Sequence, residues 1–300
     1  MPGYRKIMAV GFLIFHLCFS PVEGASAETA GKAALVLAYS LHGLADVDAK
    51  DAIAALRIYT SELAKSVGYT ADSYLYNNLD RVIADIQMGK ADLIALSAME
   101  YLRIKGRAEL ELALGHVKGG KKSVKYLLIT HQKNGYTHLE SLREKRLLMS
   151  KGDSTAQMYL QTLLLRQKFG DLNTFFSAVE EKSKTSQVAL PVFFGQADAC
   201  IITDVAFKTM VEMNPQLGRD LKVMASSPEL TTHVTAFRKS LAEDIKEKTL
   251  DVGKMLKNSA RGRQVLMLFK IEDLVPISEA DLESLRTLVG EYNQLGSGKK

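Results

Sequence analysis

Residues 146–160 read RLLMSKGDSTAQMYL, and this stretch decides the fold that we expect for the whole chain. A short apolar run predicts the end of a strand, and Gly152 permits a tight turn. Asp153, Ser154 or Thr155 can then cap a helix that continues to residue 168. The start of a helix presents unpaired N–H groups and the positive end of the helix dipole, so it can hold an anion. An ordinary cap on a surface helix would give the same sequence pattern. The choice between an anion site and an ordinary cap therefore depends on the rest of the chain.

Residues 1–27 have the pattern of a cleavable secretory signal. Two basic residues come first, an apolar run covers residues 7–19, and small residues lead up to Ala27. The apolar run is too short to cross a membrane, because a transmembrane helix needs about 20 residues. We therefore expect a periplasmic protein whose mature chain begins at Glu28.

Charge and cysteine content exclude few functions. The chain has 39 basic and 34 acidic residues among 300. Removal of residues 1–27 leaves 37 basic and 33 acidic residues, a net charge of +4, which is weak support for any partner. No basic stripe alternates with aromatic residues, so nucleic-acid binding is not expected. Cys200 is the one cysteine after the signal, and its apolar neighbours predict a buried residue without a disulfide.

Buried strands alternate with helices along the rest of the chain, which predicts βαβ units and a parallel sheet. The apolar run 33–38 leads into Ser40 and His42, and the run 91–96 leads into Ser97. Because open α/β sheets bind ligands at the carboxyl ends of their strands, these three residues are candidate ligands. Further helices are expected over residues 50–66, 79–88, 137–143, 154–168, 240–259 and 279–293, and further strands over residues 73–76, 109–115, 124–130, 173–179, 221–225 and 231–237.

A short motif occurs twice and indicates two similar units. Gly-Lys-Ala-Asp at 89–92 and Gly-Gln-Ala-Asp at 195–198 each precede a buried strand. The first strand ends in Ser97, and the second ends in Thr203 and Asp204. Two such units predict a bilobal protein in which the strand ends of the two lobes face each other. The expected boundaries are 28–118 with 227–300 for lobe 1 and 119–226 for lobe 2.

The order of these motifs resembles the periplasmic substrate-binding proteins of phosphate, phosphite and phosphonate importers. The resemblance covers roughly residues 33 to 290 and includes the ending Arg-Gly-Arg-Gln-Val-Leu followed by Phe269. It implies an α/β, two-lobed type II periplasmic binding protein fold with a ligand cleft between the lobes.

The resemblance also implies candidate ligand-binding residues. The oxyanion would be held by Ser154 and Thr155 at the helix start, and Thr185 stands where relatives often place a histidine. An acid at position 204 would repel an oxyanion unless the two share a proton, or it would bind an amino group on the ligand. The full set of candidates is Ser40, His42, Ser97, Ser154, Thr155, Thr185, Thr203 and Asp204.

The resemblance implies capture of a small oxyanion for an ABC importer. The alternative is a sensory module of the same fold that acts with a membrane sensor kinase or cyclase. An enzyme is not expected, because the chain has no Gly-x-Ser-x-Gly, no His-Glu-x-x-His and no cysteine with a positioned partner. The histidines lack metal-ligand spacing, so neither a metal nor a cofactor is expected. The expected partners are a small anion and either an ABC permease or a membrane sensor, and we expect a monomer.

Overall fold

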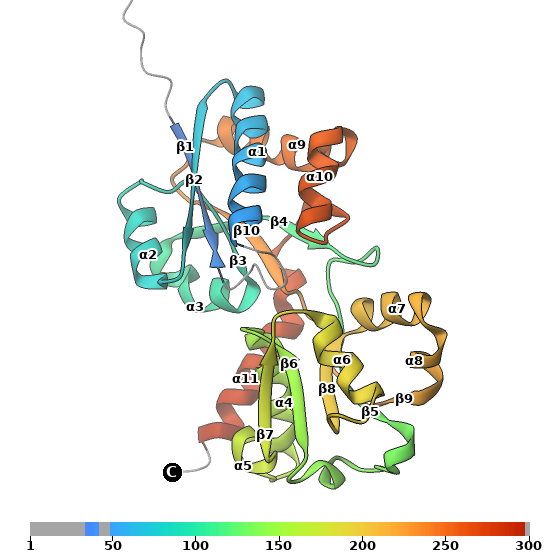
Figure 1. Ribbon diagram of the computed structural model, residues 1–300. Helices are drawn as coiled ribbons and strands as arrows, with labels where there is room; N and C mark the ends of the chain where they lie inside the picture. The colour runs from blue at the N-terminus through green and yellow to red at the C-terminus, as the bar shows by residue number, and fades with distance from the viewer. Residues whose placement is uncertain (1–33, 42–48, 298–300) are drawn as a thin grey trace, which may run out of the picture. The chain divides into compact units, whose positions relative to one another are not determined.

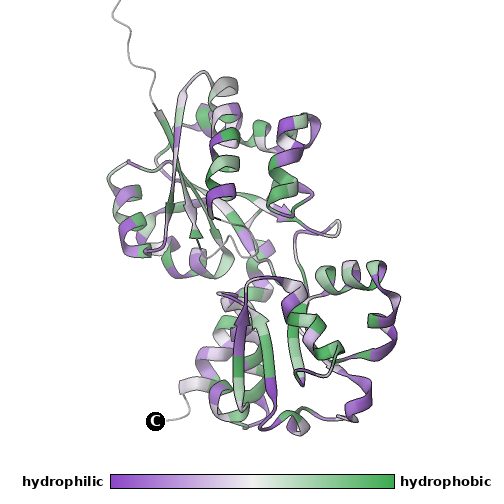
Figure 2. Ribbon diagram, viewed as in Figure 1, coloured by the Kyte–Doolittle hydropathy of each residue, from purple (hydrophilic) through white to green (hydrophobic). Residues whose placement is uncertain are grey.

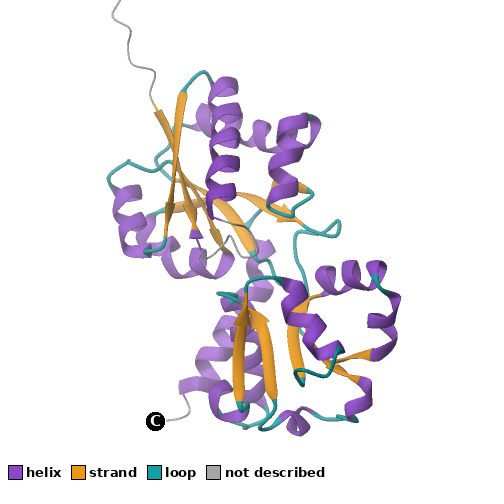
Figure 3. Ribbon diagram, viewed as in Figure 1, coloured by secondary structure: helices purple, strands orange, loops and turns teal. Residues whose placement is uncertain are grey.

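Two sheets organise the computed structural model of this chain, which describes residues 34–41 and 49–297 (Figures 1 and 3). In the six-stranded sheet the strand order is β11-β4-β10-β3-β1-β2, and in the five-stranded sheet it is β7-β6-β8-β5-β9. The first sheet consists of β1 (Ala34–Ser40), β2 (Thr70–Tyr76), β3 (Leu93–Ser97), β4 (Leu110–Val117), β10 (His233–Arg238) and β11 (Asp273–Pro276). The second consists of β5 (Tyr126–His131), β6 (Arg146–Ser150), β7 (Ala178–Lys182), β8 (Ala199–Thr203) and β9 (Leu221–Ser226).

The helices lie between these strands along the chain. The predicted signal, His42 and the other residues of 42–48 fall outside the described residues. None of the described helices has both the length and the apolar character that a membrane crossing requires. The helices are α1 (Ala49–Val67), α2 (Leu79–Gln87), α3 (Ala98–Ala108), α4 (Ser154–Arg166), α5 (Leu172–Phe175), α6 (Thr185–Phe193), α7 (Asp204–Met213), α8 (Pro215–Asp220), α9 (Glu243–Met255), α10 (Ala260–Leu268) and α11 (Glu283–Ser297).

Both sheets follow the same plan. β1 pairs in parallel with β2 and β3, and β6 pairs in parallel with β7 and β8. The next strand is antiparallel in each case: β10 beside β3, and β5 beside β8. The sheets are therefore mixed and not wholly parallel as expected, because β5 and β10 follow connections that come from the other sheet and not from a βαβ helix.

Alternating side chains place each sheet between two layers of helices. Leu35 and Leu37 of β1 belong to the apolar cluster of α1 and α10, whereas Ala38 belongs to the cluster that includes α2 and α3. In β6, Leu148 packs with α6, whereas Leu147 packs with α4. Figure 2 shows hydrophobic residues along β6 and β8. Strands buried on both faces read as continuous apolar runs, which is why the sequence revealed them.

The connections between the sheets pair with each other. Val124 and Leu230 exchange backbone hydrogen bonds of 3.0 and 2.8 Å. Beside them, Lys121 Nζ lies 2.6 Å from a carboxylate oxygen of Glu229. Strand β9 ends at Ser226, so the second connection starts at Ser227. These two connections therefore run side by side between the sheets.

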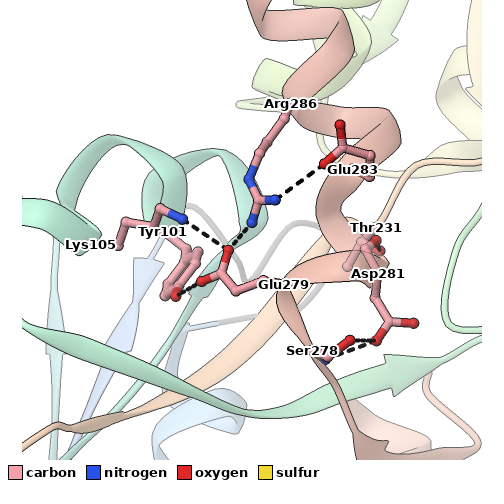
Figure 4. A network of polar contacts seen from close by, with 8 residues as sticks. All are labelled: Tyr101, Lys105, Thr231, Ser278, Glu279, Asp281, Glu283 and Arg286. Carbon is pink, nitrogen blue, oxygen red and sulfur yellow. Dashed lines mark hydrogen bonds and ion pairs between the residues drawn. The ribbon is translucent and has the colours of Figure 1, made fainter.

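The last helix, α11, packs beside α4 of the five-stranded sheet, although it follows β11 of the other sheet. Leu285 and Leu288 are buried there, and Arg166 Nη2 donates to Glu291 Oε2 at 2.6 Å. Just before α11, Glu279 accepts from Tyr101 Oη at 2.6 Å and pairs with Arg286 (Figure 4). Residues 33–300 form one unit, and the two lobe boundaries stay a prediction.

Some elements differ from expectation. The strand predicted over 173–179 is the single helical turn α5 followed by β7. The turn forms because the Asp171 carboxylate accepts from Asn173 N at 2.9 Å and caps it. The sequence also missed α10, which begins where Ser259 Oγ accepts from Gly262 N at 2.9 Å. In both cases a side-chain hydrogen bond at the N-cap explains a helix that the sequence pattern did not predict.

Candidate oxyanion site

A cavity of about 520 Å³ is lined by residues from segments of both sheets. Its volume exceeds what phosphate or methylphosphonate would need, and its walls mix polar, charged and apolar groups. The six-stranded sheet and its connections contribute His116, Lys118, Thr232, His233, Phe269, Lys270 and Glu272. The five-stranded sheet and its helices contribute Tyr126, Ser150, Asp153, Thr185, Ser186 and Thr203 among others.

Three helix starts border this cavity. Asp153 is the N-cap of α4, Thr185 is the first residue of α6, and Thr203 is the N-cap of α7. Each helix brings a partial positive charge to its first turn. The cavity therefore has the polarity that an anion requires on the side of the five-stranded sheet.

The start of α4 is already occupied by a carboxylate of this chain. Asp153 Oδ1 accepts from Ala156 N at 3.0 Å and from Tyr126 Oη at 2.9 Å. Burial raises the pKa of this carboxyl, while the hydrogen bonds from Ala156 and Tyr126 act in the opposite direction. An ionised Asp153 would repel an oxyanion placed at the same helix start.

The start of α7 is also satisfied within the chain. Thr203 Oγ1 accepts from Ala206 N at 3.3 Å. The backbone N–H of Asp204 donates to Lys125 O at 2.8 Å, and that of Val205 donates to the Asp204 carboxylate at 2.9 Å. The donors of this first turn are therefore engaged.

The start of α6 differs from the other two. Its N-cap residue, Lys184, makes no side-chain hydrogen bond to the first turn. Thr185 and Ser186 both line the cavity. Among these three helices, α6 offers an anion the first turn with the least side-chain capping.

The part of the lining that comes from the six-stranded sheet and its connections includes two lysines and one acid. Lys118 and Lys270 line the cavity. Glu272 lines it too, but its carboxylate accepts from Gly119 N at 2.7 Å and from Gly120 N at 2.9 Å. Gly119 and Gly120 have φ values of +59° and +73°, which favour glycine and aim successive N–H groups at one acceptor. The two donors stabilise the Glu272 carboxylate, which keeps its negative charge.

Two stacked imidazoles complete this wall. The rings of His116 and His233 lie 5.3 Å apart at an angle of 6°. Burial lowers the pKa of His116 to about 3, with a smaller contribution from the positive charge of Lys118. His116 is therefore neutral at physiological pH and offers a polar ring without a charge.

The structure brings together only part of the predicted site. Thr185 and Thr203 line the cavity, whereas His42 lies outside the described residues. The remaining candidates are not among its described lining residues: Ser40, Ser97, Ser154, Thr155 and Asp204.

The contacts of these other candidates are local. Ser40 Oγ and Ser97 Oγ donate to the two carboxylate oxygens of Glu100, at 2.9 and 3.0 Å. Ser154 is exposed, Thr155 is only 3% exposed, and Asp204 Oδ1 accepts from Lys125 N at 2.9 Å. Their roles as ligands stay predictions.

Sequence reasoning did not select several cavity residues. His116 and Lys118 flank the end of β4, and Phe269 and Lys270 follow α10, a helix that the sequence pattern did not predict. The signal that could have found them is the pair Gly119-Gly120, because paired glycines are typical of a connection. Within the described residues, no group of three or more His, Cys, Asp or Glu side chains is placed to hold a metal ion.

Known proteins resemble this chain along most of its length. A family model described as "ABC transporter, phosphonate, periplasmic substrate-binding protein" matches residues 44–282. PA3383 from Pseudomonas aeruginosa, a binding protein component of an ABC phosphonate transporter, aligns with a TM-score of 0.65 over 90% of this chain and 89% of its own, at 15% identity.

Two further solved structures share the fold. PhnD1 from Prochlorococcus marinus, in complex with methylphosphonate, gives a TM-score of 0.63 over 87% of this chain and 98% of its own, at 12% identity. XAC2383 from Xanthomonas citri, bound to chloride, gives 0.65 over 88% and 99%, at 14% identity. The likeness to the phosphonate-binding proteins confirms the predicted type II periplasmic binding fold.

Proposed function

The chain belongs to the family of periplasmic substrate-binding proteins of ABC phosphonate transporters, and we propose that it captures a small phosphorus oxyanion at the start of α6. The membership confirms the resemblance found in the sequence and favours transport over the sensory alternative. The family consists of transport proteins and not of enzymes, so we propose binding without catalysis.

The observation that carries this proposal is the combination of an α6 start without a side-chain cap and two lysines in one cavity. A doubly charged ligand is costly to remove from water, so its site must supply several fixed donors. Gln187 N of the first turn donates to Lys184 O at 2.9 Å, so the donors would be the N–H groups and hydroxyls of Thr185 and Ser186. Lys118 and Lys270 add positive charge from the opposite wall.

Capture would bring the two walls of the cavity closer together. The oxyanion would first meet α6 on one wall, and the lysines would then approach from the other wall by rotation about the paired connections. Closure excludes water, which strengthens each hydrogen bond to the charged ligand. Ser154 and Thr155 at α4 remain the predicted alternative position for the anion, which would require a proton on Asp153.

Calorimetric titration of residues 28–300 with methylphosphonate and with inorganic phosphate tests the proposal. Thr185→Val and Ser186→Ala should each weaken binding about tenfold, because a hydrogen bond to a charged group contributes about 1.5–3 kcal/mol. The control is Thr174→Val, whose hydroxyl donates to Asp171 O at 2.9 Å away from the cavity. If Ser154→Ala weakened binding and Ser186→Ala did not, the anion would bind at α4, and the α6 site would be contradicted.

Delivery implies export and a membrane partner. We propose that residues 1–27 direct the chain to the periplasm and are removed before Glu28, and that the mature monomer then meets an ABC permease. N-terminal sequencing of the exported protein tests cleavage, and an intact Met1 would contradict it.

A further inference from the structure

A tight hairpin, residues 118–121, follows β4 beside the large cavity and begins the first connection between the sheets. Lys118 and Lys121 exchange backbone hydrogen bonds of 2.9 and 3.2 Å. Gly119 and Gly120 form the turn between them, and both have the positive φ that a type I′ hairpin turn requires. Lys118, at the base of the hairpin, lines the cavity. Its position in the lining therefore depends on how the hairpin is held.

One residue holds the hairpin on both sides of Lys118. Glu272, which directly precedes β11, donates its backbone N–H to Val117 O at 2.9 Å. Its carboxylate accepts from Gly119 N at 2.7 Å and from Gly120 N at 2.9 Å. Lys118 therefore lies between two residues that are both bonded to Glu272, and its backbone is fixed to the end of β4.

The charge of Lys118 acts on groups from both parts of the cavity lining. His116 belongs to β4 of the six-stranded sheet, and Asp153 is the N-cap of α4 beside the five-stranded sheet. Burial is the main influence on the pKa of each of these groups, and in both cases the charge of Lys118 acts to lower the pKa. The same charge would attract an anion in the cavity.

We infer that Glu272 is a positioning residue for anion capture, because its carboxylate clamps the turn at 119–120 and so holds Lys118 in place before the ligand arrives. This inference rests on the part of the proposed function in which Lys118 attracts the oxyanion. Without the clamp, a turn of two glycines would sample many backbone conformations, since glycine has the greatest conformational freedom. Ordering the turn and the lysine would then oppose binding, which corresponds to about a three- to tenfold loss of affinity.

Two substitutions loosen the clamp without changing the charge of the cavity. Glu272→Asp keeps the carboxylate but shortens the side chain by one methylene, so it should not reach both N–H groups. Gly120→Ala strains the turn, because φ there is +73°, although an added Cβ would meet no atom within 4 Å. Calorimetric titration of residues 28–300 with methylphosphonate should show about three- to tenfold weaker binding for each variant. Gly120→Asn should bind more tightly than Gly120→Ala, because asparagine tolerates a positive φ better.

The matched control is Gly135→Ala. Gly135 has a φ of +65°, an added Cβ there would also meet no atom within 4 Å, and the residue is not among the described lining of the cavity. This substitution should lower thermal stability about as much as Gly120→Ala does. It should leave methylphosphonate affinity within about twofold of that of the unmodified chain.

A double substitution separates positioning from a general loss of structure. Lys118→Gln should weaken binding by itself, and adding Gly120→Ala should cause no further loss, because the lysine that the clamp positions is gone. If Lys118→Gln bound weakly while Glu272→Asp or Gly120→Ala kept native affinity, the inference would be overturned and the proposed function would stand. A full further loss in the double variant would have the same meaning. Native affinity in Lys118→Gln would overturn the inference together with the role of this lysine in the proposed function. No binding of methylphosphonate or inorganic phosphate by the unmodified chain would reject the proposed function and the inference with it.

Discussion

Ser40 Oγ lies 2.9 Å from Glu100 Oε1, so a serine predicted as an anion ligand instead donates to a buried carboxylate. Ser97, another predicted ligand, donates to the second oxygen of the same carboxylate at 3.0 Å and caps α3. Ser40 is 2% exposed and Glu100 is 6% exposed. A carboxylate that holds both hydroxyls would also repel an oxyanion that approached them.

We therefore predict structural roles for both serines. Ser97→Ala should lower the free energy of unfolding by about 1 kcal/mol, because an N-cap is lost. Ser40→Ala should cost about 1–3 kcal/mol, because one oxygen of Glu100 then lacks the hydroxyl that donates to it. Urea unfolding measures both costs, and calorimetry should find methylphosphonate affinity unchanged within about twofold. A tenfold loss of affinity in either variant would instead support the ligand roles that the sequence indicated.

Asp153→Asn should increase affinity for a dianionic ligand. Asparagine caps helices as well as aspartate does, so α4 should keep its start while a negative charge leaves the cavity wall. Removing one like charge near the ligand should improve affinity by about tenfold, which corresponds to about 1.4 kcal/mol.

The pH dependence of binding separates this electrostatic role from a structural one. Burial raises the pKa of Asp153, so the carboxyl takes up a proton at a higher pH than an exposed aspartate does. Sulfate keeps its charge across this range, and its affinity for the unmodified chain should increase as the pH falls through that pKa. The Asp153→Asn variant should lack this increase. An identical pH profile in both proteins would show that Asp153 does not oppose the anion.

His116 should make the fold sensitive to acid. Its pKa in the folded chain is lowered to about 3, whereas the unfolded chain has an ordinary histidine near 6.5. Between these values the unfolded state binds more protons, so stability falls as the pH is lowered from about 6.5 towards 3. The slope from this one residue is at most about 1.4 kcal/mol per pH unit.

His116→Gln should reduce that slope. Glutamine keeps a polar side chain at this position but takes up no proton. Urea unfolding at pH 7, 6, 5 and 4 should show a smaller loss of stability in the variant than in the unmodified chain. Parallel stability curves would mean that His116 is as accessible to protons in the folded state as in the unfolded state.

The repeated motif shows what a sequence pattern can establish. Asp92 accepts from Val36 N at 3.1 Å, and Asp198 accepts from Arg146 N at 2.9 Å. Each aspartate, just before one strand, thus accepts a backbone N–H from the parallel strand beside it: β1 beside β3, and β6 beside β8. The repeat was recognisable because equivalent strand pairs need the same local contact, and the continuous apolar runs identified the strands themselves.

The details of the site depended on contacts between distant segments. Glu100 is 60 residues from Ser40, and nothing near Ser40 indicates that its hydroxyl is engaged. Three residues could have capped α4; Asp153 does so by accepting from Ala156 N, and Tyr126, which is 27 residues away, also donates to it. Thr185 was a candidate through the resemblance, but the helix start at this position was not recognised, because Lys184 is not a capping residue and Pro191 interrupts the helical pattern.

The most direct test of the central claim is a crystal structure of the mature chain with methylphosphonate. We predict that the phosphorus atom lies within hydrogen-bonding reach of Thr185 and Ser186 at the start of α6, with Lys118 and Lys270 on the opposite wall. A phosphonate bound outside this cavity, or an empty cavity at a saturating ligand concentration, would contradict the account.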